Sequence, residues 1–149
     1  MNKYFIGIDI SKYKHDCFIT TETGEVIVEN FSFQNTNEGL NQLLDLLKSL
    51  DCSKQFRIGF EATGHYGMNL KLFLEKNDYS FMEFNPNMVK QFIKSQTLRK
   101  TKTDKKDATW ITKYLISVDY KPLPKQFYHK FALKSLSRKR DKLVNQLNL

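Results

Sequence analysis

Two apolar segments of the chain each end in a carboxylate. Residues 4–9 are Tyr-Phe-Ile-Gly-Ile-Asp and residues 56–61 are Phe-Arg-Ile-Gly-Phe-Glu. Short and nearly continuous apolar runs of this kind indicate buried strands, such as those at the centre of a parallel sheet. A buried carboxylate without a partner is costly, so Asp9 and Glu61 require a reason to stand at these positions.

The hydrophobic pattern predicts further strands between turn residues. Alternation over 25–33 places Val26, Val28, Phe31 and Phe33 on one inward face. The expected strands cover residues 3–10, 14–21, 25–33, 56–61 and 79–84. Because the first three are joined by short turns, we expect an antiparallel meander.

Helical spacing of apolar residues predicts helices after this meander. A cap signal at 35–38 precedes a leucine stripe from Leu40 to Leu50. The other expected helices cover residues 65–77, about 87–94 and about 104–118. The order βββαβαβα predicts an α/β fold with a mixed sheet, in which parallel strands join the meander and helices flank the sheet.

A Lys-Pro-Leu-Pro sequence at 121–124 interrupts the chain after this pattern. We therefore expect a catalytic domain over 1–120 and a basic helical extension over 121–149. Residues 133–147 follow coiled-coil spacing for barely two heptads. Since the pattern stops without a cap, we expect the extension to be the start of a longer coiled coil that is truncated here.

A third and a fourth acid, Asp104 and Asp107, begin the expected helix 104–118. Ile111 lies on the apolar stripe of that helix. Four positions before it is Asp107, and three before that is Asp104, so both acids extend the inward face. The alternative is a plain role at the helix start, where the macrodipole favours Asp; it explains Asp104 better than Asp107.

Asp9, Glu61, Asp104 and Asp107 are therefore the candidate catalytic and metal-binding residues. Mg²⁺ and Mn²⁺ prefer oxygen ligands, which makes either ion the expected cofactor. Two such ions can activate a nucleophile and stabilise a leaving oxygen in phosphodiester chemistry. His65 and Tyr66, which follow Glu61 closely, are near enough to touch a substrate, although a surface or half-buried role explains each equally well.

Charge is unevenly distributed along the 149 residues, whose net charge is +8. Residues 1–89 hold 8 Lys and Arg against 12 Asp and Glu, whereas residues 90–149 hold 16 against 4. This asymmetry favours a polyanionic partner such as nucleic acid, and a solvated basic surface is the alternative. The candidate nucleic-acid-binding residues are Arg99, Lys100, Lys102, Lys105, Lys106, Arg138, Lys139 and Arg140.

Three segments of the chain together resemble one family. They are 7–11 (Gly-Ile-Asp-Ile-Ser), 61–66 (Glu-Ala-Thr-Gly-His-Tyr) and 102–108 (Lys-Thr-Asp-Lys-Lys-Asp-Ala). In this order they resemble the N-terminal, RuvC-like domain of the DEDD transposases of insertion-sequence family one hundred and ten, relatives of the Piv DNA invertase. The resemblance covers about residues 3–118, and the basic extension also looks like that of the family.

The resemblance implies a ribonuclease H-like fold and a Mg²⁺-binding tetrad of Asp9, Glu61, Asp104 and Asp107. It implies transposition or inversion of a mobile DNA element, with DNA as partner and a cytoplasmic, nucleoid-associated prokaryotic protein. Some family members are guided by a structured RNA, which extends the expected partners to a guide RNA. The family carries its catalytic serine in a later domain, so we expect this chain alone to be incomplete for strand exchange.

Other functions remain open at this point. Residues 7–11 also resemble the first phosphate loop of actin-like kinases, although a second phosphate loop is not visible. ATP binding would favour such a kinase fragment, and nucleic-acid binding without a metal effect would favour a non-catalytic binding module. We expect no membrane partner, because no run approaches about 20 apolar residues, and a homo-oligomer through the C-terminal helix is a further expectation.

Overall fold

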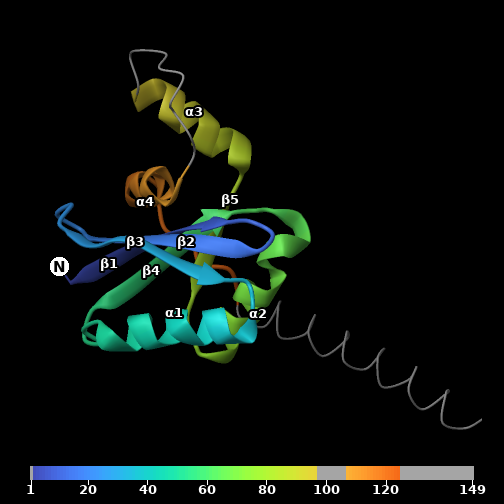
Figure 1. The fold of residues 1–149 in the computed structure, drawn as a ribbon. Coiled ribbons are helices and arrows are strands. Elements are labelled where there is room, and N and C mark those ends of the chain that lie inside the picture. The colour runs from blue at the N-terminus through green and yellow to red at the C-terminus, as the bar shows by residue number, and fades with distance from the viewer. Residues whose placement is uncertain (1, 97–106, 125–149) are drawn as a thin grey trace, which may run out of the picture.

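The computed structural model describes residues 2–96 and 107–124. They form a mixed five-stranded sheet with strand order β3-β2-β1-β4-β5 (Figure 1). The strands are β1 (Lys3–Ile10), β2 (Lys14–Thr21), β3 (Val26–Gln34), β4 (Gln55–Glu61) and β5 (Phe81–Phe84). β1 and β3 run antiparallel to β2, whereas β4 runs parallel to both β1 and β5. The predicted meander with added parallel strands is therefore confirmed.

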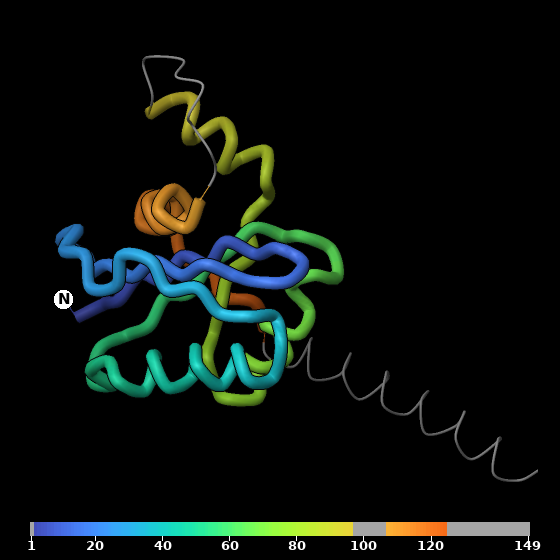
Figure 2. Tube along the Cα trace, viewed as in Figure 1, coloured from blue at the N-terminus to red at the C-terminus, as the bar shows by residue number. Residues whose placement is uncertain are grey.

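Four α-helices and one short 3-10 helix flank this sheet within the described residues. They are α1 (Asn37–Ser49), the 3-10 helix (Gly64–Gly67), α2 (Met68–Lys76), α3 (Pro86–Gln96) and α4 (Ala108–Ser117). Figure 2 shows α1 and α2 on one side of the sheet and α4 on the other. This α/β arrangement is ribonuclease H-like, as the family resemblance implies.

The side chains of β1 alternate between the two faces of the sheet. Ile6 and Ile8 point into the core that α1 and α2 cover, and both are at most 1% exposed. Phe5 belongs instead to the cluster beneath α3 and α4. Gly7 and Asp9 lie on the same face as Phe5, because successive residues of a strand face opposite sides.

α1 begins where the cap signal predicts it. The Thr36 hydroxyl accepts a hydrogen bond from the Gly39 amide at 3.1 Å. Leu40, Leu43 and Leu47 of the predicted stripe are buried against the sheet. An amphipathic helix thus covers one face with the residues that its spacing predicts.

β3 departs from its predicted alternation. Val26, expected on the inward face, is 51% exposed, and Ile27 is exposed beside it. The register of β3 against β2 shifts at two places, and β3 is one of the two edge strands of the sheet. Bulges change which face a residue takes, and strict period-two reasoning does not see them.

The start of α4 is also later than predicted. Asp107 has an extended backbone and caps the helix, which begins at Ala108 rather than at 104. The capping hydrogen bond makes the helix start here, since a capping residue itself takes non-helical angles.

The described chain ends at 124, on the edge of β5. The Leu123 amide donates to the Phe81 carbonyl at 2.9 Å, and the Leu123 side chain packs against the core. The predicted coiled coil at 133–147 lies outside the described residues. In 2–96 and 107–124, we find no helix with the length and apolar character needed to cross a membrane.

Candidate functional site

Two glycines allow α4 to lie directly on the central strands. Gly7 and Gly59 are register partners on β1 and β4. A Cβ atom at Gly7 would overlap the Thr112 hydroxyl and lie 2.9 Å from the Ala108 carbonyl oxygen, while one at Gly59 would lie 2.9 Å from Leu115 Cδ1. A larger side chain at Gly7 would meet the backbone of α4 and push the helix away from the sheet, whereas one at Gly59 would first meet the ring of Phe84 on β5.

The two strand-ending acids lie two residues beyond these glycines. Asp9 follows Gly7 and Glu61 follows Gly59, and a spacing of two keeps each acid on the face of its glycine. β1 and β4 are parallel neighbours, so both acids are near the carboxyl ends of the central strands. Open α/β sheets place their binding sites at this edge.

Asp107 is held above the same edge by its role as the helix cap. Its carboxylate accepts a hydrogen bond from the Trp110 amide at 3.2 Å. The Ala108 carbonyl beside Gly7 brings the amino end of α4 over β1. Asp107 therefore does have the role at the helix start that the sequence left open as an alternative. The same hydrogen bond holds its carboxylate near Asp9.

The electrostatics of Asp9 link these acids. Burial raises the pKa of Asp9 to about 6, and the neighbouring carboxylates of Asp16, Glu61 and Asp107 add to the rise. Like charges that share a site disfavour the ionised form of each other. Four acids, from β1, β2, β4 and the N-cap of α4, therefore interact at one end of the sheet. We call this group the acidic edge: Asp9, Asp16, Glu61 and Asp107.

Asp16 is an acid that the sequence analysis missed. It is the register partner of Asp9 across the β1–β2 hairpin, and Ser32 on β3 donates a hydrogen bond to its carboxylate. The signal that would reveal it is hairpin register, because Ile10 pairs with His15 and the next pair joins the two acids. A shift of one residue would place His15 there instead.

The rest of the predicted site cannot be placed. Asp104 lies outside the described residues, as do all the candidate nucleic-acid-binding residues: Arg99, Lys100, Lys102, Lys105, Lys106, Arg138, Lys139 and Arg140.

The donor chemistry of the acidic edge fits a divalent cation. All four side chains offer carboxylate oxygens, and a bound cation would offset both the burial and the repulsion that raise the pKa of Asp9. Among the residues that the structure describes, no three His, Cys, Asp or Glu side chains lie close enough together to hold a metal ion as they stand. The edge therefore supplies suitable ligands, and their spacing would have to tighten around an ion.

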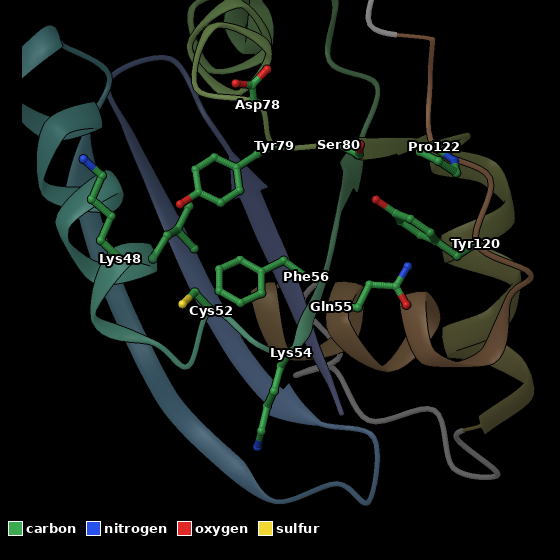
Figure 3. Close-up of a pocket in the computed structure, with 11 residues that line it drawn as sticks. Lys48, Cys52, Lys54, Gln55, Phe56, Asp78, Tyr79, Ser80, Tyr120 and Pro122 are labelled. Carbon is green, nitrogen blue, oxygen red and sulfur yellow. The ribbon is translucent and has the colours of Figure 1, made fainter. Parts of the chain in front are cut away.

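A pocket lies at the other end of the sheet. It encloses about 430 Å³ between the start of β4 and the segment before β5 (Figure 3). The rings of Phe56 and Tyr79 stack at its wall, with centroids 5.9 Å apart. Because Gln55 opens β4 and Glu61 closes it, this pocket is separate from the acidic edge.

Comparison with known families agrees with this geometry. A model of the DEDD transposases of the IS110 type, described as a transposase family, matches residues 6–148. The chain belongs to this transposase family. No curated protein sequence matches it.

Membership of the family bears on the class of reaction that the acidic edge serves. The match spans Asp9, Glu61, Asp104 and Asp107 and most of the basic extension. Transposases cut and rejoin DNA, so the chain belongs to a class of enzymes whose substrate is DNA. The kinase alternative gains no support from this match.

Proposed function

We propose that this chain is the N-terminal catalytic domain of a DNA transposase or recombinase, and that its acidic edge performs metal-dependent phosphodiester chemistry. In this proposal Asp9, Glu61 and Asp107 hold Mg²⁺ or Mn²⁺, with Asp104 completing the set. The observation that carries the proposal is that the carboxylates of Glu61 and Asp107 add to the rise that burial causes in the pKa of Asp9, in a chain of the transposase family.

Each acid would contribute through the element that holds it. Asp9 and Glu61 come from adjacent parallel strands, whose backbones are fixed by sheet hydrogen bonds. Asp107 is oriented by its hydrogen bond to the Trp110 amide, which leaves its second carboxylate oxygen for another ligand. Bound at such a site, divalent ions can activate a nucleophile and stabilise the leaving oxygen.

The basic C-terminal half would hold the nucleic acid. Residues 90–149 carry a net charge of +12, and Lys and Arg contacts to phosphate give affinity without sequence readout. We propose DNA as the main partner and a structured guide RNA as a second, with the extension after 124 joining copies of the chain. A later domain bearing a serine nucleophile would be needed for complete strand exchange.

Strand nicking by the 149-residue chain tests the metal-dependent step. Supercoiled DNA that carries element ends is incubated with Mg²⁺ and, in parallel, without it. We expect weak nicking that requires the ion and that is lost in Asp9→Asn and Asp107→Asn.

The matched control is Glu29→Gln, which removes an exposed acid from the edge strand β3. Nicking by Asp9→Asn at the rate of the unaltered chain would contradict the metal role. Rejoined recombinant product from this chain alone would contradict the expectation that a further domain is needed.

A further inference from the structure

The exposed aromatic side chains of the described residues are concentrated at one place. Tyr13 is 72% exposed and Tyr66 is 39% exposed, whereas the other tyrosine, phenylalanine and tryptophan side chains in 2–96 and 107–124 are buried or half-buried. Tyr13 lies in the turn after β1, four residues beyond Asp9. Tyr66 lies in the 3-10 helix after β4, five residues beyond Glu61.

A single asparagine ties these two segments together. The side-chain amide of Asn35 donates to the Lys12 carbonyl at 3.2 Å and to the Tyr66 carbonyl at 3.4 Å. The Asn35 backbone amide donates to the Tyr13 carbonyl at 2.8 Å. The two tyrosines therefore belong to adjoining segments, which Figure 1 shows at one end of the sheet.

A buried histidine supports this junction from within the fold. The ring nitrogen Nδ1 of His15 accepts a hydrogen bond from the Ser11 amide at 3.2 Å, at the start of the turn. His15 is fully buried, and burial lowers its pKa, although the neighbouring Asn35 side chain acts in the other direction. Its Nδ1 is thus an acceptor that holds the turn in which Tyr13 lies.

The chemistry of this surface suits a nucleotide. The Lys12 ammonium lies over the Tyr13 ring, 5.1 Å from its centroid, so a cation is already held against one face of this exposed aromatic ring. Cationic groups that track phosphate, combined with aromatic rings on which bases stack, are the common elements of single-strand binding. A paired base has both of its faces covered within a duplex, so only an unpaired base can lie on such a ring.

We infer that Tyr13 and Tyr66 form a stacking surface for an unpaired nucleotide of the strand that passes the acidic edge. The inference rests on the proposed function and deepens it, because it states that the strand at the acidic edge is unpaired. The carboxylates there repel phosphate, so tight binding requires a divalent cation as well as the aromatic rings.

Fluorescence anisotropy tests the inference with the 149-residue chain and three labelled probes of about 12 nucleotides, a length within the usual single-strand site size. The probes are a thymidine strand, a uridine strand and a DNA duplex, each in the presence of Mg²⁺. Tyr13→Leu and Tyr66→Leu remove the aromatic face, whereas Tyr13→Phe and Tyr66→Phe retain it. The control is Ile27→Ala, which alters an exposed apolar residue on β3.

Each leucine variant is expected to weaken binding of the single strands by about tenfold, since stacking of one base carries an effect of this size. The phenylalanine variants and the control should bind as the unaltered chain does, and duplex affinity should be unchanged throughout. A larger loss with thymidine than with uridine identifies DNA as the stacked strand, and the reverse identifies RNA.

Single-strand affinity that is the same in the leucine variants and the unaltered chain overturns the inference. An equal loss with the duplex also overturns it, because that result would mean general phosphate binding. Mn²⁺ affinity measured on the same proteins separates this outcome from a failure of the proposed function. That affinity should fall in Asp9→Asn and stay unchanged in the leucine variants.

Discussion

The two faces of the sheet are built for different purposes. The face beneath α1 and α2 is filled by large apolar side chains that are almost completely buried, such as Ile6, Leu43 and Phe60. The face beneath α4 has glycines at its centre and a buried threonine, and it ends in acids. Both faces bury apolar side chains that stabilise the fold, and the second face also sets the distance between α4 and a row of carboxylates.

The difference between the faces shows that residues without a side chain can determine where a site forms. At Gly7 and Gly59 the absence of a side chain brings α4 against the strands. The amino end of the helix then carries Asp107 to the strand ends. Changes on the first face should therefore alter stability alone, whereas changes on the second that displace α4 should alter metal binding too.

Leu43→Ala should have the largest effect on stability. Leu43 is completely buried on α1, and truncation of such a leucine costs about 3 kcal/mol through lost burial and a residual cavity. Urea unfolding measures the loss. The folded fraction should keep its Mn²⁺ affinity, and a parallel loss of affinity would mean that the two faces are not separate.

Gly7→Ala should have the next largest effect on stability and should also weaken Mn²⁺ binding. The added methyl group overlaps the Thr112 hydroxyl, so α4 must move outward at a cost of about 2 kcal/mol. Because α4 carries Asp107, Mn²⁺ affinity should fall as well. Unfolding and Mn²⁺ titration of the same variant test this, and an unchanged affinity would show that the helix position is not critical.

Asp9→Asn should stabilise the metal-free protein at neutral pH. Burial and the neighbouring acids raise the pKa of Asp9 to about 6, so between about pH 4 and that value the native protein retains a proton that the unfolded chain has released. Stability therefore falls as the pH rises through this window.

The asparagine side chain does not titrate, so Asp9→Asn avoids this loss of stability. After allowance for solvent screening, its free energy of unfolding at pH 7 should exceed that of the unaltered chain by about 1 kcal/mol. Urea unfolding at pH 7 and near pH 4 measures it, and the gain should vanish at the lower pH. A variant that is less stable than the unaltered chain at pH 7 would mean that burial and the neighbouring acids do not disfavour the ionised Asp9 carboxylate.

Thr112→Val should have the smallest effect. The Thr112 hydroxyl donates to the Ala108 carbonyl at 2.6 Å and lies 3.2 Å from the Phe18 carbonyl oxygen. Valine keeps the shape and removes one buried hydrogen bond, which costs about 1 kcal/mol or less. Thermal unfolding measures the loss, and Mn²⁺ affinity should be retained because α4 stays in place.

Much of this architecture was predictable because its signals are local. Thr36 caps α1 through its own side chain, and the leucines that follow repeat with helical spacing. The apolar run ending at Asp9 could be recognised as a central strand for the same reason. Such signals depend on neighbouring residues, which sequence displays directly.

The missed features depend on register between segments. Asp16 joins the acidic edge only because the β1–β2 hairpin pairs it with Asp9. Val26 faces solvent because β3 contains irregularities in its pairing. The start of α4 at Ala108 follows from a hydrogen bond that Asp107 makes. None of these can be read from hydrophobic periodicity, which assumes regular elements of known length.

Titration of Mn²⁺, followed by its electron paramagnetic resonance signal, tests the account most directly. It compares the 149-residue chain with Asp9→Asn and with Glu29→Gln, which removes an acid from the exposed edge of β3. If the acidic edge holds the ion, Asp9→Asn should weaken binding by at least about tenfold, a loss typical of damage to a metal site, while Glu29→Gln binds as the unaltered chain does. Equal affinity in Asp9→Asn and the unaltered chain would contradict the assignment of this edge as the metal centre.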